Sequence, residues 1–343
     1  MTAVTHIQGS EGDGHALTKA DFQSDQETRW CPGCGDYAVL SAVQQFMPEL
    51  GIPPERIVFI TGIGCAGRFA YYMDTYGMHS IHGRAPAIAT GLASARDDLS
   101  IWVVSGDGDS LSIGGNHLIH ALRRNVPVKI LLLNNQIYGL TKGQASPTSE
   151  LGKITKSTPF GVSDHPFNPV ALAIGAEATF VARTLDRDRH HLTSVLRAAA
   201  AHEGSALVEI YQNCPVFNDG AFFPLTEKDT RDLNQIRLEV GEPIRFGPER
   251  ERGVAMRSDG RLEIVDVDDV GVEALLVHDP GRDDPGLAFS LAKLSSDPTG
   301  PTPIGIFRDV ARPVYGRAVG SDSAASDVEL AALLESGDTW TIA

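Results

Sequence analysis

The sequence predicts an α/β fold, a doubly wound and mostly parallel sheet with a small C-terminal extension. Two observations support this prediction. Short, almost wholly apolar runs alternate with segments of helical spacing, and glycine-rich turns follow several of these runs. Fully apolar strands that alternate with helices indicate a parallel sheet covered on both faces. Ligands of such sheets bind beyond the carboxyl ends of the strands, which is where the glycine-rich turns fall.

The individual elements can be placed in chain order. Strand-like runs lie at 56–62, 99–109, 126–135, 179–184 and 206–213, and helix-like segments at 37–50, 85–96, 114–125, 169–176 and 190–204. The first run, RIVFITG, is β-branched and ends in glycine, as a strand would. The segment APAIATGLASAR is rich in small residues that let another backbone approach closely.

Two stretches interrupt this alternation. Residues 138–169 have no core-forming period and are rich in Thr, Ser, Gly and Pro. A loop of this length inside a compact domain is usually functional or disordered. After about residue 240 the sequence becomes acidic, and several Pro and Gly turns follow. We interpret 1–20 as a flexible tail, 21–245 as the main domain and 246–343 as an appended extension that ends in a polar tail.

Composition excludes several classes of partner. The chain has 343 residues, of which 42% are hydrophobic and 21% charged, so it can bury a sizeable core. Its net charge of -15 argues against non-specific binding of nucleic acid or anionic membranes, because the long-range field repels polyanions. No run approaches the about eighteen apolar residues of a membrane helix. The N-terminal residues lack the pattern of a secretory signal, so we expect a cytoplasmic protein.

Two predicted strands end in groups suited to a diphosphate and its metal. Gly106-Asp107-Gly108-Asp109 follows IWVVS, and Asn134-Asn135 follows KILLL. Mg²⁺ prefers hard oxygen ligands, which Asp and Asn supply. Glycines let backbone amides approach phosphate, and a helix beginning near Leu111 would direct its positive end there. Either half alone is typical of an ordinary turn, but the two halves together favour a diphosphate site.

The four cysteines suggest metal or redox chemistry. Each lies in a loop that contains Gly or Pro: Cys31 and Cys34 in CPGC, Cys65 in GIGCAG, and Cys214 in NCPVF. Four thiolates suit a [4Fe–4S] cluster or a structural zinc, although a zinc ribbon would prefer a second Cys-x-x-Cys. A thioredoxin-like pair is disfavoured, since CPGC precedes the first evident strand. Spacing alone leaves zinc, a cluster and free buried thiols open.

The loop that holds Cys65 also contains a formal G-x-G-x-x-G, formed by Gly62, Gly64 and Gly67. A dinucleotide site would need a helix opening there and an acidic residue at the end of a second strand about twenty residues later. Asp74 is too close and is not in a strand-like context. We therefore interpret this loop as one that presents Cys65.

Taken together, these segments resemble the β subunit of 2-oxoacid:ferredoxin oxidoreductases over roughly residues 20–240. The matching segments are WCPGCGDY, TGIGCAGR, HSIHGRAPAIATG, GDGD, GGNHLIHALRRN, NNQIYGLTKGQASPTS and NCPVFND. The span from GDG to NN is itself similar to the signature of thiamine-diphosphate enzymes. The resemblance implies a thiamine-diphosphate-binding (pyrophosphate-domain) fold.

The resemblance also implies site residues. It implies Mg²⁺ on Asp107, the Asn135 side chain and the Ile137 carbonyl, and a [4Fe–4S] cluster on the four cysteines. It further implies cofactor contacts from His82, Gly83, Arg84, Gly106, Gly108, Asp109 and Thr141. Lys142 matches members that act on 2-oxoglutarate or a broad set of 2-oxoacids, where its ammonium would pair with the distal carboxylate; a solvated loop lysine is the alternative. His117 is better explained as a packed core histidine.

The function implied is the β subunit of a thiamine-diphosphate-dependent oxidoreductase for a 2-oxoacid, with 2-oxoglutarate favoured. The products are an acyl-CoA (succinyl-CoA) and CO₂, and electrons pass through the cluster to ferredoxin. Two alternatives stay open within thiamine chemistry: a lyase or ligase subunit without a redox cluster, and a pyruvate or broad-range oxidoreductase. A third is a non-catalytic, metal-stabilised subunit.

The resemblance also implies partners. Thiamine catalysis needs a glutamate from a second domain, which we do not find in this chain. We therefore expect no catalytic side chain here, and activity only with an α subunit, separate or as a fused γ–α chain, in an (αβ)₂ heterotetramer. Coenzyme A and the 2-oxoacid are the small-molecule ligands. The acidic net charge gives no steering toward ferredoxin, itself usually acidic, so its docking surface would be a local basic patch or lie on the α subunit.

Overall fold

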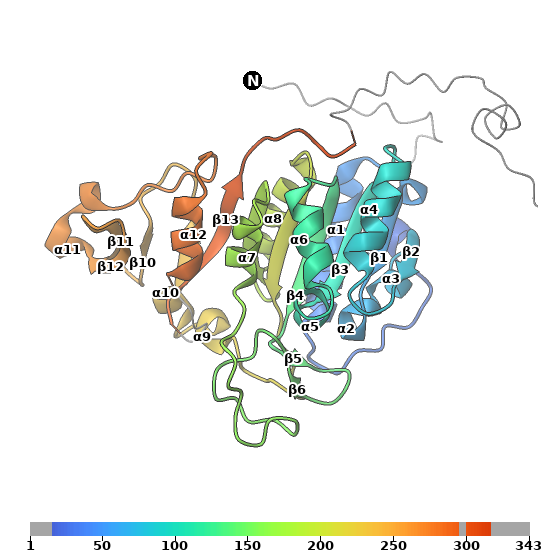
Figure 1. The fold of residues 1–343 in the computed structure, drawn as a ribbon, viewed down its shortest axis with the longest axis horizontal. Helices are drawn as coiled ribbons and strands as arrows, with labels where there is room; N and C mark the ends of the chain where they lie inside the picture. Colours follow the sequence, from blue (N-terminus) through green and yellow to red (C-terminus); the bar gives the residue numbers. More distant parts are fainter. Residues whose placement is uncertain (1–15, 295–299, 317–343) are drawn as a thin grey trace, which may run out of the picture.

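The core of the fold is a sheet of eight strands (Figure 1), seen in a computed structural model that describes residues 16–294 and 300–316. The strand order is β2-β1-β3-β4-β8-β7-β13-β9. Six of these strands are mutually parallel: β1 (Ile57–Thr61), β2 (Tyr76–His79), β3 (Ser100–Gly106), β4 (Val128–Asn134), β7 (Phe180–Leu185) and β8 (Ala206–Tyr211). The predicted mostly parallel α/β fold is confirmed.

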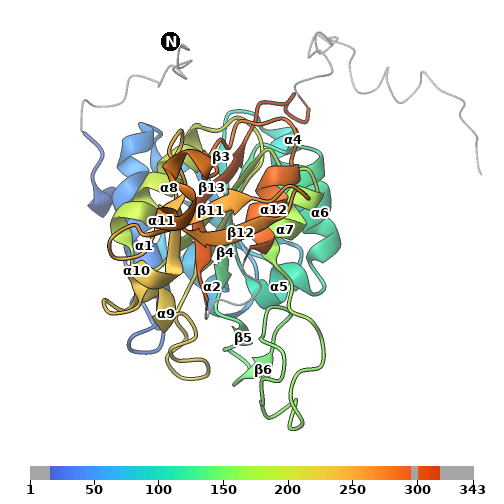
Figure 2. The same ribbon diagram turned by 90° about the vertical axis from the view of Figure 1, so that its left-hand side faces the viewer.

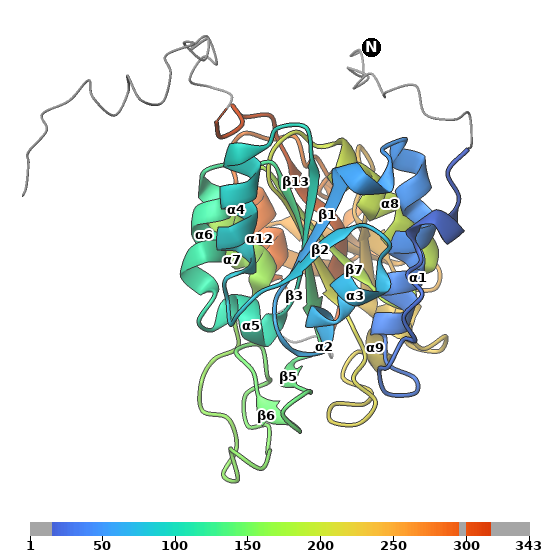
Figure 3. The same cartoon turned by 90° about the vertical axis from the view of Figure 1, so that its right-hand side faces the viewer.

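Helices cover both faces of the sheet, which explains why its central strands are buried along almost their whole length (Figure 3). One layer consists of α4 (Ala85–Ala95), α6 (Gly115–Arg123), α7 (Pro169–Gly175) and α12 (Gly286–Lys293). The other consists of α1 (Asp36–Phe46), α3 (Phe69–Tyr72) and α8 (Arg189–Ala201). In β3, Ile101 and Val103 face the first layer, while Trp102 and Val104 face the second. None of the helices in the described part is long and apolar enough to cross a membrane.

The carboxyl ends of β1, β3, β4 and β8 meet at one edge of the sheet. The helix expected near Leu111 begins earlier than predicted, because α5 (Asp107–Leu111) starts directly after β3. The long segment after β4 opens with a hairpin of β5 (Ile137–Tyr138) and β6 (Gln144–Ala145) and is otherwise irregular to α7, as expected. Figure 1 shows this loop hanging below the sheet at the same edge. All the predicted strand-end motifs are therefore gathered on one rim.

The C-terminal part of the chain is not simply appended. It begins with β9 (Gln235–Leu238). A small antiparallel sheet follows, made of β10 (Arg245–Phe246), β11 (Arg252–Met256) and β12 (Leu262–Asp266), and then the helices α11 (Val267–Val270) and α12. Figure 2 views the molecule from the side of this small sheet. Strand β13 (Thr302–Asp309) then enters the main sheet, antiparallel to β7 and parallel to β9.

The main sheet therefore crosses the boundary expected at residue 245. The acidic, turn-rich sequence marks the small sheet, but nothing local indicates that the chain afterwards returns to the large one. Residues 1–15 and 317–343, which include most of the expected tails, lie outside the described residues.

A buried ion pair fastens the returning strand. Arg183 on β7 donates from Nε to Glu209 Oε2 on β8 at 2.7 Å, and both side chains are almost fully buried. Arg183 also donates to the Pro303 carbonyl of β13 at 3.3 Å. The second oxygen of Glu209 accepts from the Asn134 amide of β4 at 2.7 Å. Four strands are thus joined through one polar network.

We expect Arg183→Met to lower the free energy of unfolding by about 3–5 kcal/mol, because it leaves the Glu209 carboxylate buried without its cation. Urea-induced unfolding followed by circular dichroism measures the change. Arg197→Met is the matched control, since Arg197 pairs with Glu49 on the exposed surface, where a pair contributes about 0–1 kcal/mol. Equal losses in the two variants would contradict the role assigned to Arg183.

Candidate functional site

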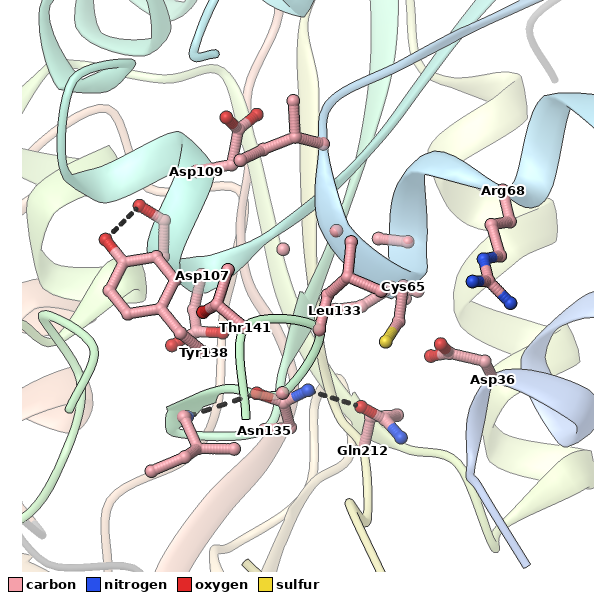
Figure 4. Close-up of a pocket in the computed structure, with 18 of the residues that line it drawn as sticks. Asp36, Cys65, Arg68, Asp107, Asp109, Leu133, Asn135, Tyr138, Thr141 and Gln212 are labelled. Atoms are coloured by element: carbon pink, nitrogen blue, oxygen red, sulfur yellow. Dashed lines mark hydrogen bonds between the residues drawn. The ribbon is translucent and has the colours of Figure 1, made fainter. Parts of the chain in front are cut away.

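A pocket of about 450 Å³ lies at the rim where the parallel strands end (Figure 4). The residues that line it come from α1, from α2 (Gly64–Gly67) with the loop around it, from α5, and from the turns after β2, β4 and β8. Nine residues singled out from the sequence are among them: Cys65, His82, Gly106, Asp107, Gly108, Asp109, Asn135, Ile137 and Thr141. The fold thus brings together segments that lie more than a hundred positions apart in the sequence.

Asp107 is the first residue of α5, and its carboxylate is buried. Two hydroxyls of the loop after β6 donate to its Oδ2, from Ser146 at 2.5 Å and from Thr148 at 2.6 Å. Burial raises the pKa of Asp107, while these hydroxyls and the backbone N–H groups of Gly108 and Asn135 oppose that rise. Its partners are therefore neutral donors, and a divalent cation would supply the missing positive charge.

Asn135 and Ile137 follow β4 and face the same pocket. The Asn135 side-chain nitrogen donates to Gln212 Oε1 at 3.0 Å, and its oxygen accepts from the Ile137 N–H at 3.1 Å. These bonds fix which way the amide oxygen points. Within 16–294 and 300–316, no three His, Cys, Asp or Glu side chains surround one point as metal ligands. The predicted magnesium set contains a single carboxylate, and such a small protein contribution is typical of Mg²⁺ that is also bound by phosphate.

Asp109 has a structural task that its motif did not reveal. Its carboxylate accepts from the Gly83 N–H at 2.7 Å and from the Ser105 hydroxyl at 2.8 Å. It thereby fastens the HGR segment to β3, and only its backbone N–H is left for a phosphate. Gly108 has a packing reason to be glycine, because a Cβ there would lie 2.2 Å from the Tyr138 ring.

Only some of the other expected cofactor contacts line the pocket. His82 and Thr141 line the pocket, whereas Gly83 and Arg84 do not. The Arg84 guanidinium instead donates to the His82 carbonyl at 2.9 Å, which helps to fix the loop that carries His82. His117 is half-buried on α6 and does not line the pocket.

The four cysteines converge beside this pocket, and all four are free thiols. The pKa of Cys34 is raised by burial first, and in part by Cys65 and Cys214. Burial raises the pKa of Cys65 to about 11, to which Cys214 and Cys31 also contribute. A Cβ placed on Gly139 would lie 3.4 Å from the Cys214 sulfur and 4.0 Å from that of Cys65. The donor set is therefore four neighbouring thiols, without a histidine.

This arrangement bears on the choice between zinc and a cluster. A single zinc ion holds its thiolates at about 2.3 Å, which requires the four sulfurs to close around one point. The described residues contain no such closed set. A [4Fe–4S] cluster is a larger body that spreads its four ligands. Four neighbouring thiols without a histidine are a donor set that suits a [4Fe–4S] cluster.

Two further residues of the pocket were missed in the sequence. Asp36 is buried, and among the described residues no nitrogen or oxygen donor meets its carboxylate. Burial raises its pKa to about 7, although the Cys34 thiol opposes the rise, and Asp186 adds to it. Arg68 also lines the pocket, and its guanidinium donates to the Arg29 carbonyl. Both residues stand inside the quoted segments WCPGCGDY and TGIGCAGR, but nothing local indicates that their side chains face a cavity.

Lys142 does not line this pocket. Its backbone is left-handed, with φ of 78°, and its side chain is exposed. It lines a second, neighbouring depression of about 470 Å³, together with Lys153, Lys156 and several apolar side chains. Arg68, and not Lys142, is therefore the residue of these two that lines the main pocket.

The chain is similar to known proteins over most of its length. Residues 62–210 match the family described as thiamine pyrophosphate enzyme, C-terminal TPP binding domain. Over 329 residues the chain is 59% identical to the 2-oxoglutarate oxidoreductase subunit KorB of Mycobacterium tuberculosis, and the match covers 94% of this chain and 88% of the relative. It is 45% identical over 192 residues to the 2-oxoacid:ferredoxin oxidoreductase subunit beta of Saccharolobus solfataricus, covering 55% of this chain and 63% of that one.

The fold is also similar to a solved structure, that of 2-oxoglutarate:ferredoxin oxidoreductase from Magnetococcus marinus with 2-oxoglutarate, coenzyme A and succinyl-CoA bound. The TM-score is 0.74 at 32% identity, and the match covers 94% of this chain and 97% of that chain. The resemblance seen in the sequence and the thiamine-diphosphate-binding fold are both confirmed. The chain is a subunit of an oxidoreductase, and it belongs to the family of 2-oxoacid:ferredoxin oxidoreductase β subunits.

Proposed function

We propose that this chain is the β subunit of a 2-oxoglutarate:ferredoxin oxidoreductase, which converts 2-oxoglutarate and coenzyme A to succinyl-CoA and CO₂ and passes the electrons to ferredoxin. One observation carries the proposal: the predicted magnesium ligands and Cys65 line the same pocket. A diphosphate site and a thiol cluster that share a rim are what oxidation by single-electron transfer requires. The names of the relatives support 2-oxoglutarate as the substrate.

Asp107, Asn135 and the Ile137 carbonyl would hold Mg²⁺, and the N–H groups at the start of α5 would hold the diphosphate. The Asp107 carboxylate is kept in place for this by Ser146 and Thr148. When bound, thiamine diphosphate supplies a nucleophilic carbon for the keto group and an electron sink for decarboxylation. This chain's residues would hold and orient the reactants. Tyr138 and Gly108 both line the pocket, and the Tyr138 hydroxyl donates to the Gly108 carbonyl, which holds these two parts of the lining together.

Cys31, Cys34, Cys65 and Cys214 would hold a [4Fe–4S] cluster, which would accept electrons one at a time. Neighbouring donors keep this set in place: the Gln212 amide donates to the Cys34 sulfur at 3.2 Å, and the Trp30 indole donates to the Cys65 carbonyl at 2.9 Å. The buried thiols have raised pKa values, so binding of iron would have to displace their protons.

A partner subunit completes the site in this proposal. The acidic residues that line the pocket are Asp36, Asp107 and Asp109, and no glutamate is among its lining residues. We assign the glutamate required by thiamine chemistry to an α subunit, in an (αβ)₂ assembly. The pocket would then lie at the interface between the two chains.

The proposed function predicts about four iron atoms and four acid-labile sulfides per anaerobically prepared chain. With an α subunit added, the complex should reduce methyl viologen in the presence of 2-oxoglutarate and coenzyme A. The chain without α should not. Protein that binds thiamine diphosphate but lacks iron and sulfide would favour the lyase or ligase alternative, and dye reduction by this chain alone would refute the need for α.

We expect Asp107→Ala to abolish magnesium-dependent binding of thiamine diphosphate. Thr148→Val should weaken it by about 10–100-fold, since groups that orient a metal ligand contribute on that scale. Calorimetric titration of the αβ complex at several magnesium concentrations gives both affinities. Thr193→Val is the control, because the Thr193 hydroxyl bonds only its own helix, at the Arg189 carbonyl. Wild-type affinity in Thr148→Val would remove the hydroxyl from this role.

We expect Arg68→Met to raise the KM for 2-oxoglutarate by at least about tenfold, because the loss of a charge-assisted hydrogen bond to a substrate carboxylate costs about 1.5–3 kcal/mol. Lys142→Met should change it less, since Lys142 lies outside the pocket. Initial rates over a range of 2-oxoglutarate concentrations separate the two variants. A larger rise of this KM in Lys142→Met than in Arg68→Met would assign the cation that pairs with the substrate carboxylate to Lys142.

A further inference from the structure

The second depression is lined by basic residues, although the chain as a whole is acidic. The chain has a net charge of -15, yet three ammonium groups, those of Lys142, Lys153 and Lys156, line one hollow. We call this hollow, lined by these lysines with Ile154, Val216 and Phe217, the lysine depression. We infer that it is the docking surface for the acidic, ferredoxin-type electron carrier. The inference rests on the proposed function and adds the place at which electrons leave.

The position of the lysine depression is the first argument. Gly139 lies against the sulfurs of Cys65 and Cys214. The chain then turns, with the Lys142 N–H bonded to the Gly139 carbonyl at 3.0 Å, so that Lys142 and Gly143 line the depression. The start of this turn therefore lies at the thiols, and its end lines the depression.

A second turn leads from the cysteines to the same place. Cys214 begins a tight turn that is closed by the Asn218 N–H on the Cys214 carbonyl at 3.0 Å. The middle residues of this turn, Val216 and Phe217, line the depression. A carrier seated there would lie against the turn that begins at Cys214. Electron transfer between proteins needs such proximity.

The chemistry of the surface is the second argument. Ile154 and Val216 are 73% and 56% exposed, and they line the same depression as the three lysines. Lys153 is held by Asn218 at 2.5 Å and by Glu150 at 2.9 Å, while the Lys142 and Lys156 side chains are exposed. A small apolar centre with a charged rim suits a transient complex of the limited size that redox partners form. The positive rim would steer an acidic carrier that the rest of this chain repels.

The phosphates of coenzyme A are the competing ligand for three lysines. The exposed apolar side chains between the ammonium groups favour a protein surface, because phosphates would place charge against Ile154 and Val216. A change of charge in the depression would alter the KM for ferredoxin if a carrier docks there, and the KM for coenzyme A if phosphates bind there. This difference is the basis of the test.

The test uses the αβ complex with Lys156→Glu, Lys156→Ala and the control Lys293→Glu, which alters an exposed lysine on α12. The KM for purified ferredoxin should rise about tenfold in Lys156→Glu and less in Lys156→Ala, because steering by local charge changes association by at least that factor. It should stay at the wild-type value in Lys293→Glu. Reduction of methyl viologen and the KM values for 2-oxoglutarate and coenzyme A should not change. The wild-type KM for ferredoxin should also rise with ionic strength, and less so in Lys156→Glu.

An unchanged KM for ferredoxin in Lys156→Glu, with normal dye reduction, would overturn the docking surface and leave the proposed function standing. A raised KM for coenzyme A in its place would assign the lysine depression to phosphates and overturn the inference as well. A wild-type complex with its full iron content that reduces neither dye nor ferredoxin would contradict the proposed function itself, and the docking surface with it.

Discussion

The site depends on a carboxylate held without a cationic partner. Asp107 is buried at the end of β3, where only hydroxyl and backbone donors meet it. Thr148, which donates to this carboxylate, also lies 3.0 Å from Asn134 Oδ1, and Asn134 in turn donates to Glu209, the partner of Arg183. The polar network of the sheet interior is thus continuous with the site. A carboxylate so desolvated favours a bound cation, and the surrounding strands keep it from turning toward solvent.

The fold and the principal motifs were predictable because their signals are local. Apolar runs identified five of the parallel strands, and the joint occurrence of GDGD and NN after two of them located the rim at which the pocket lies. Parallel strands place their carboxyl ends at one edge, so the convergence of Asp107, Asn135 and Cys65 follows from topology alone. The long loop was also identified correctly as irregular, and it supplies Ser146 and Thr148.

What could not be predicted depends on long-range packing. Nothing near Thr302–Asp309 indicates that this segment enters the main sheet between β7 and β9, because its partners lie more than sixty positions away. The positions of the Asp109 and Lys142 side chains could not be predicted from their motifs. The Asp109 carboxylate accepts a hydrogen bond from the loop at Gly83, and Lys142 lines the lysine depression. Asp36 and Arg68 were present in quoted segments, but their position in the pocket depends on how α1 and α2 meet the sheet.

The place of β13 affects how the chain can be made. Strand β9 pairs only with β13 among the described strands, and β7 has β13 on its outer side. During synthesis, β7 therefore remains an open edge until about seventy further positions beyond β9 have left the ribosome, and open edges invite pairing with other chains. A nascent or truncated product that stops before Thr302 would carry intact cofactor motifs on an unfinished sheet. Its yield in cells would then depend on chaperones that cover this edge.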